Sequence, residues 1–228
     1  MSKEKDFDKG HIYTLVNYFY WFIMGNLYFL LLNIPVFLVL MKINYFGAAE
    51  TSLLEIYLAC IPIGPSITAL FGVMGTLIRK KDINITKDYF RMYKMNFKQS
   101  IILWLMVLTV LFILYVDIAT AKNLFVYLYI LLFLLVMMIS LYMLPITSRF
   151  YLKTKDIIII SIIKVFKEIK ITLLLLVTVA FSFLIFNFMP GISILFIISA
   201  LCFTIMYLES ALLMKMEEDL ASLEKESN

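Results

Sequence analysis

Residues 79–98 read RKKDINITKDYFRMYKMNFK, and they hold seven of the twenty lysine and arginine residues in the chain. Six more lie between Arg149 and Lys170. Apolar runs long enough to cross a bilayer flank both segments. Because the cytoplasmic loops of membrane proteins are rich in Lys and Arg, this placement predicts an integral membrane protein whose two basic segments face the cytoplasm.

The composition indicates the same class of protein. Hydrophobic residues make up 63% of the 228 residues, well above the roughly 45–50% of soluble domains. We therefore expect an all-α, polytopic integral membrane protein with lipid along its sides. The net charge of +4 follows from the basic cytoplasmic segments, and no basic module outside them predicts binding to nucleic acid.

The apolar runs predict six transmembrane helices in one membrane domain, residues 1–214, followed by an acidic cytoplasmic tail, residues 215–228. The six spans are placed at about residues 19–41, 56–78, 101–120, 124–148, 171–189 and 192–214. From the N-terminal arm to the tail, the segments outside these spans carry three, one, seven, one, six, none and two lysines and arginines. High and low counts alternate, so both termini are predicted to be cytoplasmic.

The first basic segment is predicted to contain an amphipathic helix, with Thr86 as its N-cap and Asp88 in its first turn. Four cations at steps of four, three and four residues then share one face: Lys87, Arg91, Lys94 and Lys98. Aromatic and apolar residues occupy the other side. Such a helix suits either anionic lipid headgroups at the membrane surface or a cytoplasmic protein partner.

The second basic segment repeats part of this pattern. Thr154-Lys155-Asp156 corresponds to Thr86-Lys87-Asp88, and it again precedes an amphipathic stretch and a span. We interpret the repeat as a weak internal duplication of parallel sense, which gives two cytoplasmic amphipathic segments in all.

Polar and proline residues inside the spans mark candidate kinks. Asn33 and Pro35 are predicted to bend the first span. Pro65 is predicted to interrupt the second span, where prolines and glycines gather. Interrupted helices are typical of transporter binding sites, but only this span offers such a sequence.

Two acidic residues are candidates for intramembrane chemistry. Asp117 lies near the outer end of the third span. Glu209 lies in the sixth span, roughly 8 Å from its cytoplasmic end at 1.5 Å per residue. Two interpretations of Glu209 stay open: an ion pair with Arg149 or Arg79, or a proton-coupling acid.

No residue pattern predicts an enzyme. His11 is the only histidine, so a His-based triad or metal cluster cannot be built. Cys60 and Cys202 lie in apolar runs without CxxC spacing, and the glycines of the second span do not form a phosphate-binding loop. We expect no catalytic residue, no metal site and no cofactor.

Four blocks of sequence occur in a recognisable order. They are NLYFLLLNIP (26–35), GPSITAL (64–70), YKMNFKQS (93–100) and LPITSRF (144–150). Together they resemble the YesL-like family of bacterial membrane proteins, whose domain has unknown function (number 624), over about residues 18–177. The chain departs from the family pattern in a longer first extracellular loop, Lys42–Glu55.

The resemblance implies a multi-pass protein of the bacterial cell membrane, found mainly in Gram-positive bacteria. Relatives are often encoded near carbohydrate uptake systems, so we expect a non-enzymatic accessory or regulatory component of solute transport. The alternative is an autonomous small-solute carrier or channel. The expected partners are the lipid bilayer, anionic lipid headgroups, and a transporter complex or further copies of the chain.

Overall fold

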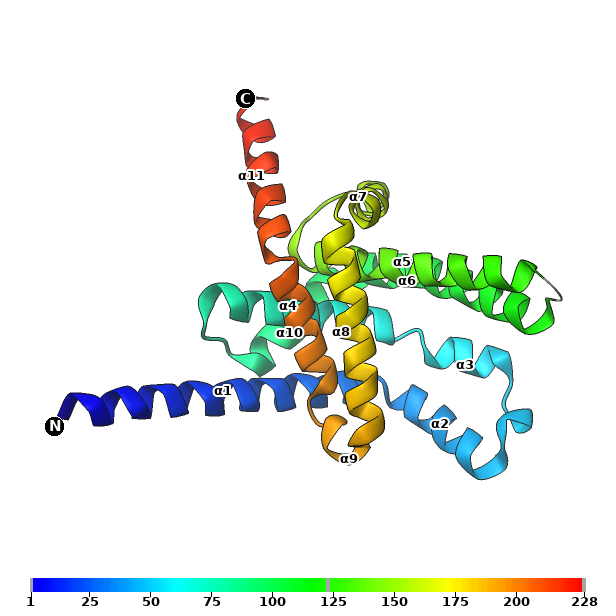
Figure 1. Ribbon diagram of the computed structural model, residues 1–228, viewed down its shortest axis with the longest axis horizontal. Coiled ribbons are helices and arrows are strands. Elements are labelled where there is room, and N and C mark those ends of the chain that lie inside the picture. Colours follow the sequence, from blue (N-terminus) through cyan, green and yellow to red (C-terminus); the bar gives the residue numbers. More distant parts are fainter. Residues whose placement is uncertain (1, 122–123, 227–228) are drawn as a thin grey trace.

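The computed structural model describes residues 2–121 and 124–226, and in these ranges the chain consists of helices joined by short turns, without strands (Figure 1). The all-α prediction is therefore confirmed. The elements are α1 (Ser2–Leu32), α2 (Ile34–Phe46), η1 (Ala48–Glu50), α3 (Leu53–Ala59), α4 (Ile63–Lys80), α5 (Ile85–Thr120), α6 (Phe125–Arg149), α7 (Thr154–Lys167), α8 (Ile169–Phe188), α9 (Pro190–Ser193), α10 (Ile197–Leu208) and α11 (Ser210–Glu226).

Within the described residues, four helical stretches are long and apolar enough to cross a membrane. They are Leu53–Lys80, Ile85–Thr120, Phe125–Arg149 and Ile169–Phe188. Two bent pairs bring the number to six if each pair is one span: Val16–Leu32 with Ile34–Phe46, bent by 70°, and Ile197–Leu208 with Ser210–Asp219, bent by 51°. The polytopic prediction is thus confirmed, but its first and last spans are broken rather than merely kinked.

The first break is stabilised by a polar contact as well as by proline. Pro35 lies in the first turn of α2, where its missing N–H would have no helical partner. Asn33, only 2% exposed, donates from Nδ2 to the Phe29 carbonyl and to the Ser66 hydroxyl, both at 2.7 Å. The bend is therefore fixed against α4.

The segment Lys42–Glu55, predicted to be a loop, is largely helical. Helix α2 continues to Phe46, η1 follows, and α3 begins at Leu53. An ion pair between Lys42 Nζ and Glu55 Oε2, 2.7 Å apart, joins the two ends of the segment. Because the side chains of Lys42 and Glu55 form an ion pair, their charges are compatible with a helical segment.

The second span is interrupted earlier than Pro65. Helix α3 ends at Ala59 and α4 begins at Ile63, so Pro65 lies in the first turn of α4, where proline is tolerated. Trp104 of α5 packs against Gly64, and its Nε1 donates to the carbonyl of Cys60 at 2.9 Å. The interruption therefore has its own hydrogen-bond partner on α5.

Helix α5 joins the predicted amphipathic helix and the third span in one unbroken helix of 36 residues. Its N-cap is Asn84, not Thr86, because Asn84 Oδ1 accepts from the Lys87 backbone N–H at 3.1 Å. The Thr86 hydroxyl instead lies 2.7 Å from the Tyr28 hydroxyl. In the second basic segment, α7 and α8 are separated at Glu168, so the two segments of the proposed duplication differ in structure.

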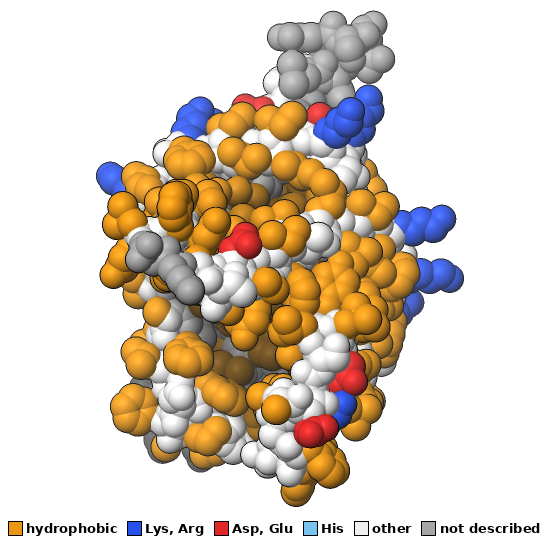
Figure 2. Space-filling view, turned by 90° about the vertical axis from the view of Figure 1, so that its right-hand side faces the viewer, with side chains coloured by type: hydrophobic (Ala, Val, Ile, Leu, Met, Phe, Trp, Pro, Cys, Tyr) orange, Lys and Arg blue, Asp and Glu red, His pale blue; other side chains and the backbone are white. Residues whose placement is uncertain are grey.

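Helix α4 forms the centre of the fold. Between Gly64 and Leu77 only Ile67 is not buried, and α4 contacts α1, α5, α6 and α10. In contrast, only 11% of the most apolar window of α6, and of α8, is buried within the protein. Figure 2 shows hydrophobic side chains over most of one face, with Lys and Arg at its margins. Lipid is the environment that such a surface requires.

The helices do not form one parallel bundle. Figure 1 shows the α5–α6 pair extending to one side of the centre, while α8, α10 and α11 run in a different direction. Both groups meet at α4, which contacts α5, α6 and α10. Helix α4 itself carries three buried polar residues, Ser66, Thr68 and Thr76.

Candidate functional site

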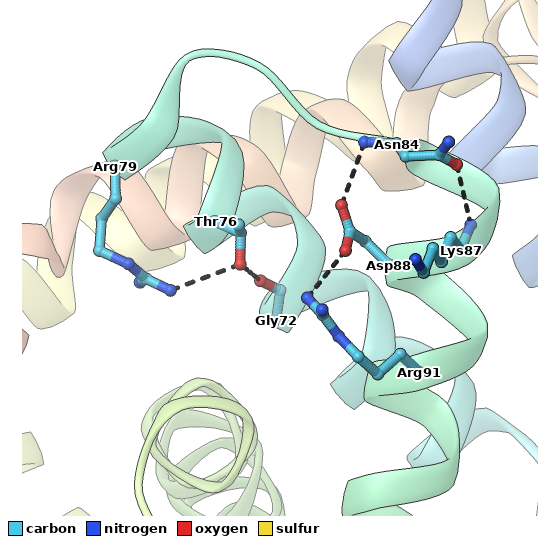
Figure 3. A network of polar contacts seen from close by, with 7 residues as sticks. All are labelled: Gly72, Thr76, Arg79, Asn84, Lys87, Asp88 and Arg91. Carbon is cyan, nitrogen blue, oxygen red and sulfur yellow. Dashed lines mark hydrogen bonds and ion pairs between the residues drawn. The ribbon is translucent and has the colours of Figure 1, made fainter.

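A network of polar contacts lies where the end of α4 turns into α5 (Figure 3). The Asp88 carboxylate accepts a hydrogen bond from the backbone N–H of Asn84 at 3.1 Å and pairs with the Arg91 guanidinium at 2.8 Å. On α4, the Thr76 hydroxyl donates to the Gly72 carbonyl at 2.8 Å. A cavity of about 410 Å³ lies between these groups.

This first cavity has balanced charges. Lys80 and Arg91 contribute two positive charges to its wall, and Asp82 and Asp88 contribute two negative charges. Asp88 already caps α5 and pairs with Arg91. The groups around the turn therefore stabilise the start of α5, and they leave no net charge for a ligand.

The four predicted cations of α5 are all exposed: Lys87, Arg91, Lys94 and Lys98. We call these four residues the basic surface. Among the described residues, only Arg91 of the four forms an ion pair. Three lysine charges thus remain available to an anionic partner.

The opposite side of α5 is attached to the core by a residue that sequence reasoning did not single out. Tyr89 is fully buried, and its hydroxyl donates to the Ser66 carbonyl at 3.1 Å. Ser66 is also the residue that accepts from Asn33. Ser66 of α4 thus contacts both the bend between α1 and α2 and the first turns of α5.

Glu209 is fully buried at the break between α10 and α11. Within the described ranges, neither of its carboxylate oxygens has a hydrogen-bond partner. The predicted pairing with Arg149 or Arg79 is wrong: Arg149 pairs with Glu217 of α11, and Arg79 contacts the Thr76 hydroxyl at 3.4 Å. The cation whose charge acts on Glu209 is Lys164 of α7.

The remaining candidates do not join this region. Asp117 is half-buried in the last turn of α5, at the end opposite to the basic surface. Cys60 and Cys202 are free thiols. No group of three or more His, Cys, Asp or Glu residues that could hold a metal ion occurs in the part of the chain that the structure describes.

The helical composition, the apolar exterior and the broken spans define a multi-pass α-helical membrane protein. Residues 22–118 match the family model described as "Protein of unknown function, DUF624", which confirms the resemblance seen in the sequence. The matched range runs from the middle of α1 nearly to the end of α5, and it includes Asn33, Ser66 and the basic surface. Neither a curated protein nor a solved structure matches the chain.

Proposed function

We propose that this chain is a non-enzymatic accessory or regulatory component of a membrane transport system, with carbohydrates as the solute class. One observation carries the proposal: the basic surface and a membrane span belong to the same unbroken helix, α5. A protein bound at the basic surface would therefore act directly on the membrane-embedded part of the chain.

The surroundings of α5 support this role. Tyr89 ties the first turns of α5 to α4 through Ser66, so the basic surface is held rigidly against the core. Lys87, Lys94 and Lys98 are exposed and have no acidic partner among the described residues. The partner that fits is the acidic cytoplasmic surface of a transport protein, because opposite charges steer and orient such complexes.

Crosslinking in membranes tests the proposal. The full chain is crosslinked in cells, purified in mild detergent, and its partners are identified by mass spectrometry. We expect a transport protein to be recovered with the wild type and lost when Lys87, Arg91, Lys94 and Lys98 are all replaced by Gln. A matched control replaces four exposed lysines of the second basic segment: Lys153, Lys155, Lys167 and Lys170. Recovery of the wild-type chain alone would refute the proposal.

A second candidate function is an autonomous small-solute carrier, which Glu209 favours. Ionisable residues buried within membrane segments mark ion and substrate pathways, and carriers bind substrate at broken helices. Glu209 combines both features. If the chain is a carrier, Glu209→Gln abolishes uptake into vesicles that contain the purified protein. Wild-type vesicles that move no candidate sugar would exclude this function.

A further inference from the structure

A second cavity, of about 180 Å³, lies between the ends of α4 and α6 and the side of α5. Its polar lining comes from Arg79, Asn96, Thr147, Ser148 and Arg149, and methionine and aromatic side chains complete the wall. These residues are far apart in the sequence. Arg79 and Arg149 are the first residues of the two basic segments.

The charges of this cavity are not balanced. Arg79 and Arg149 both line it, and each guanidinium lies within the electrostatic reach of the other. The Arg149 side chain is only 8% exposed, whereas its partner Glu217 is 64% exposed. Among the described residues, Arg79 has only the long contact to the Thr76 hydroxyl at 3.4 Å. The Glu217 carboxylate thus acts on two guanidinium groups, those of Arg79 and Arg149. One positive charge in this partly enclosed space is therefore not neutralised.

Asn96 adds a hydrogen-bond donor that has no acceptor. The residue is 8% exposed, and its buried Nδ2 atom has no partner among the described residues. An unsatisfied buried donor costs free energy, and a bound ion or ligand is one arrangement that satisfies it. Here it lines the same cavity as the two arginines.

We propose that this cavity binds a phosphate monoester group, which Arg79 and Arg149 hold by charge while Asn96 donates a hydrogen bond to it. Guanidinium groups bind phosphate through paired N–H donors. A phosphate monoester carries more negative charge than a carboxylate, which matches two guanidinium groups. The ends of α4 and α6 carry partial negative charge, so anion binding depends on the arginines. This site is independent of the proposed partner surface on α5.

Two sources could supply the group: a soluble phosphate compound or the headgroup of phosphatidic acid. The first arm of the test is equilibrium dialysis of the purified full chain in detergent with radiolabelled inorganic phosphate, with chloride as competitor at equal ionic strength. The second arm measures thermal stability in nanodiscs that contain either phosphatidic acid or the same fraction of phosphatidylglycerol, whose phosphate is a diester.

Four variants make either arm decisive. Arg79→Gln is expected to weaken binding roughly tenfold, as the loss of one charge-assisted hydrogen bond predicts. Asn96→Asp replaces the donor with a carboxylate that repels the phosphate, so it is expected to weaken binding at least as much. Glu217→Gln, at an exposed residue of α11, removes the competing acid and is expected to tighten binding roughly threefold. Lys155→Gln removes one exposed charge from α7, outside the cavity, and leaves binding unchanged.

Binding of inorganic phosphate with this pattern of variants supports a soluble ligand. Stabilisation by phosphatidic acid alone, with the same pattern, supports a lipid headgroup. Two outcomes overturn the proposal: folded wild-type protein that responds to neither probe, or a loss of binding in Lys155→Gln equal to that in Arg79→Gln. Because Glu217→Gln alters only an exposed side chain, the proposal stays testable if Asn96→Asp does not fold.

Discussion

The side-chain amide of Asn33 donates a hydrogen bond to the hydroxyl of Ser66, with 2.7 Å between Nδ2 and Oγ. This bond joins the break after α1 to the first turn of α4, the central helix. Ser66 Oγ in turn donates toward the Pro62 carbonyl at 2.8 Å. A buried polar chain therefore connects a broken span to an interrupted one.

Replacing Asn33 by Ala should destabilise the protein by about 1 kcal/mol, since a buried interhelical hydrogen bond is lost. Thermal unfolding in detergent measures the change. Asn187→Ala is the matched control, because Asn187 makes the same type of bond to the carbonyl four residues earlier, at 2.8 Å, but is exposed. Equal losses in the two variants would contradict an interhelical role for Asn33.

Gly64→Ala is expected to cost about 1–3 kcal/mol, the usual effect of overpacking. A methyl group at this position would overlap the Trp104 side chain, and it would displace the indole N–H from the Cys60 carbonyl. Unfolding of the purified variant tests this. Gly191→Ala serves as the control, because its added methyl group meets nothing within 4 Å. A Gly64 variant as stable as the control would show that α4 and α5 can separate freely.

The lowered pKa of Lys164 predicts that the stability of the protein depends on pH. Desolvation lowers the pKa of Lys164 below its ordinary value of 10.5, and the charges of Lys167 and Lys215 lower it further, while Glu168 opposes them. The unfolded chain therefore binds more protons between the folded pKa and 10.5, so stability from this group rises with pH in that window. Below the folded pKa the cost of burying the charge is fully present.

The variant Lys164→Met tests this effect. It should melt higher than the wild type at pH 7, and the difference should shrink as the pH approaches 10. Paired thermal melts across this range provide the measurement. A difference that stays constant with pH would mean that the Lys164 amine is equally accessible in the folded and unfolded states.

The orientation drawn from the basic segments predicts which residues an external reagent can reach. With Cys60 and Cys202 replaced by Ser, single cysteines Lys87→Cys and Lys167→Cys should resist a membrane-impermeant maleimide in intact cells. Both should react after the cells are opened, because both positions are exposed on the protein. Labelling in intact cells would reverse the assigned topology.

Composition and charge placement predicted the fold class because lipid imposes long apolar helices on any chain that crosses it. They could not predict where helices break. The bend at Asn33 depends on Ser66, 33 residues away. Asn84 rather than Thr86 is the N-cap of α5, because its side chain accepts a hydrogen bond from the Lys87 backbone N–H. The helices within Lys42–Glu55 do not follow from the sequence, because charged residues are as typical of loops as of helix surfaces.

The sequence likewise predicts only part of the candidate sites. The exposed cations of α5 follow from helical spacing alone. The pairing of Glu209 was mispredicted because a sequence does not reveal that Glu217, two helical turns later, lies closer to Arg149. The second cavity was missed entirely, since Arg79, Asn96 and Arg149 come together only when three helices pack.

The unbroken course of α5 has a dimensional consequence. Thirty-six residues extend about 54 Å at 1.5 Å per residue, whereas the hydrocarbon layer is about 30 Å thick. Nearly half of the helix must therefore project beyond the lipid tails or tilt within them. If the helix tilts, Lys87 moves sideways within the headgroup layer. The local thickness of the bilayer therefore determines how far the lysines extend into the cytoplasm.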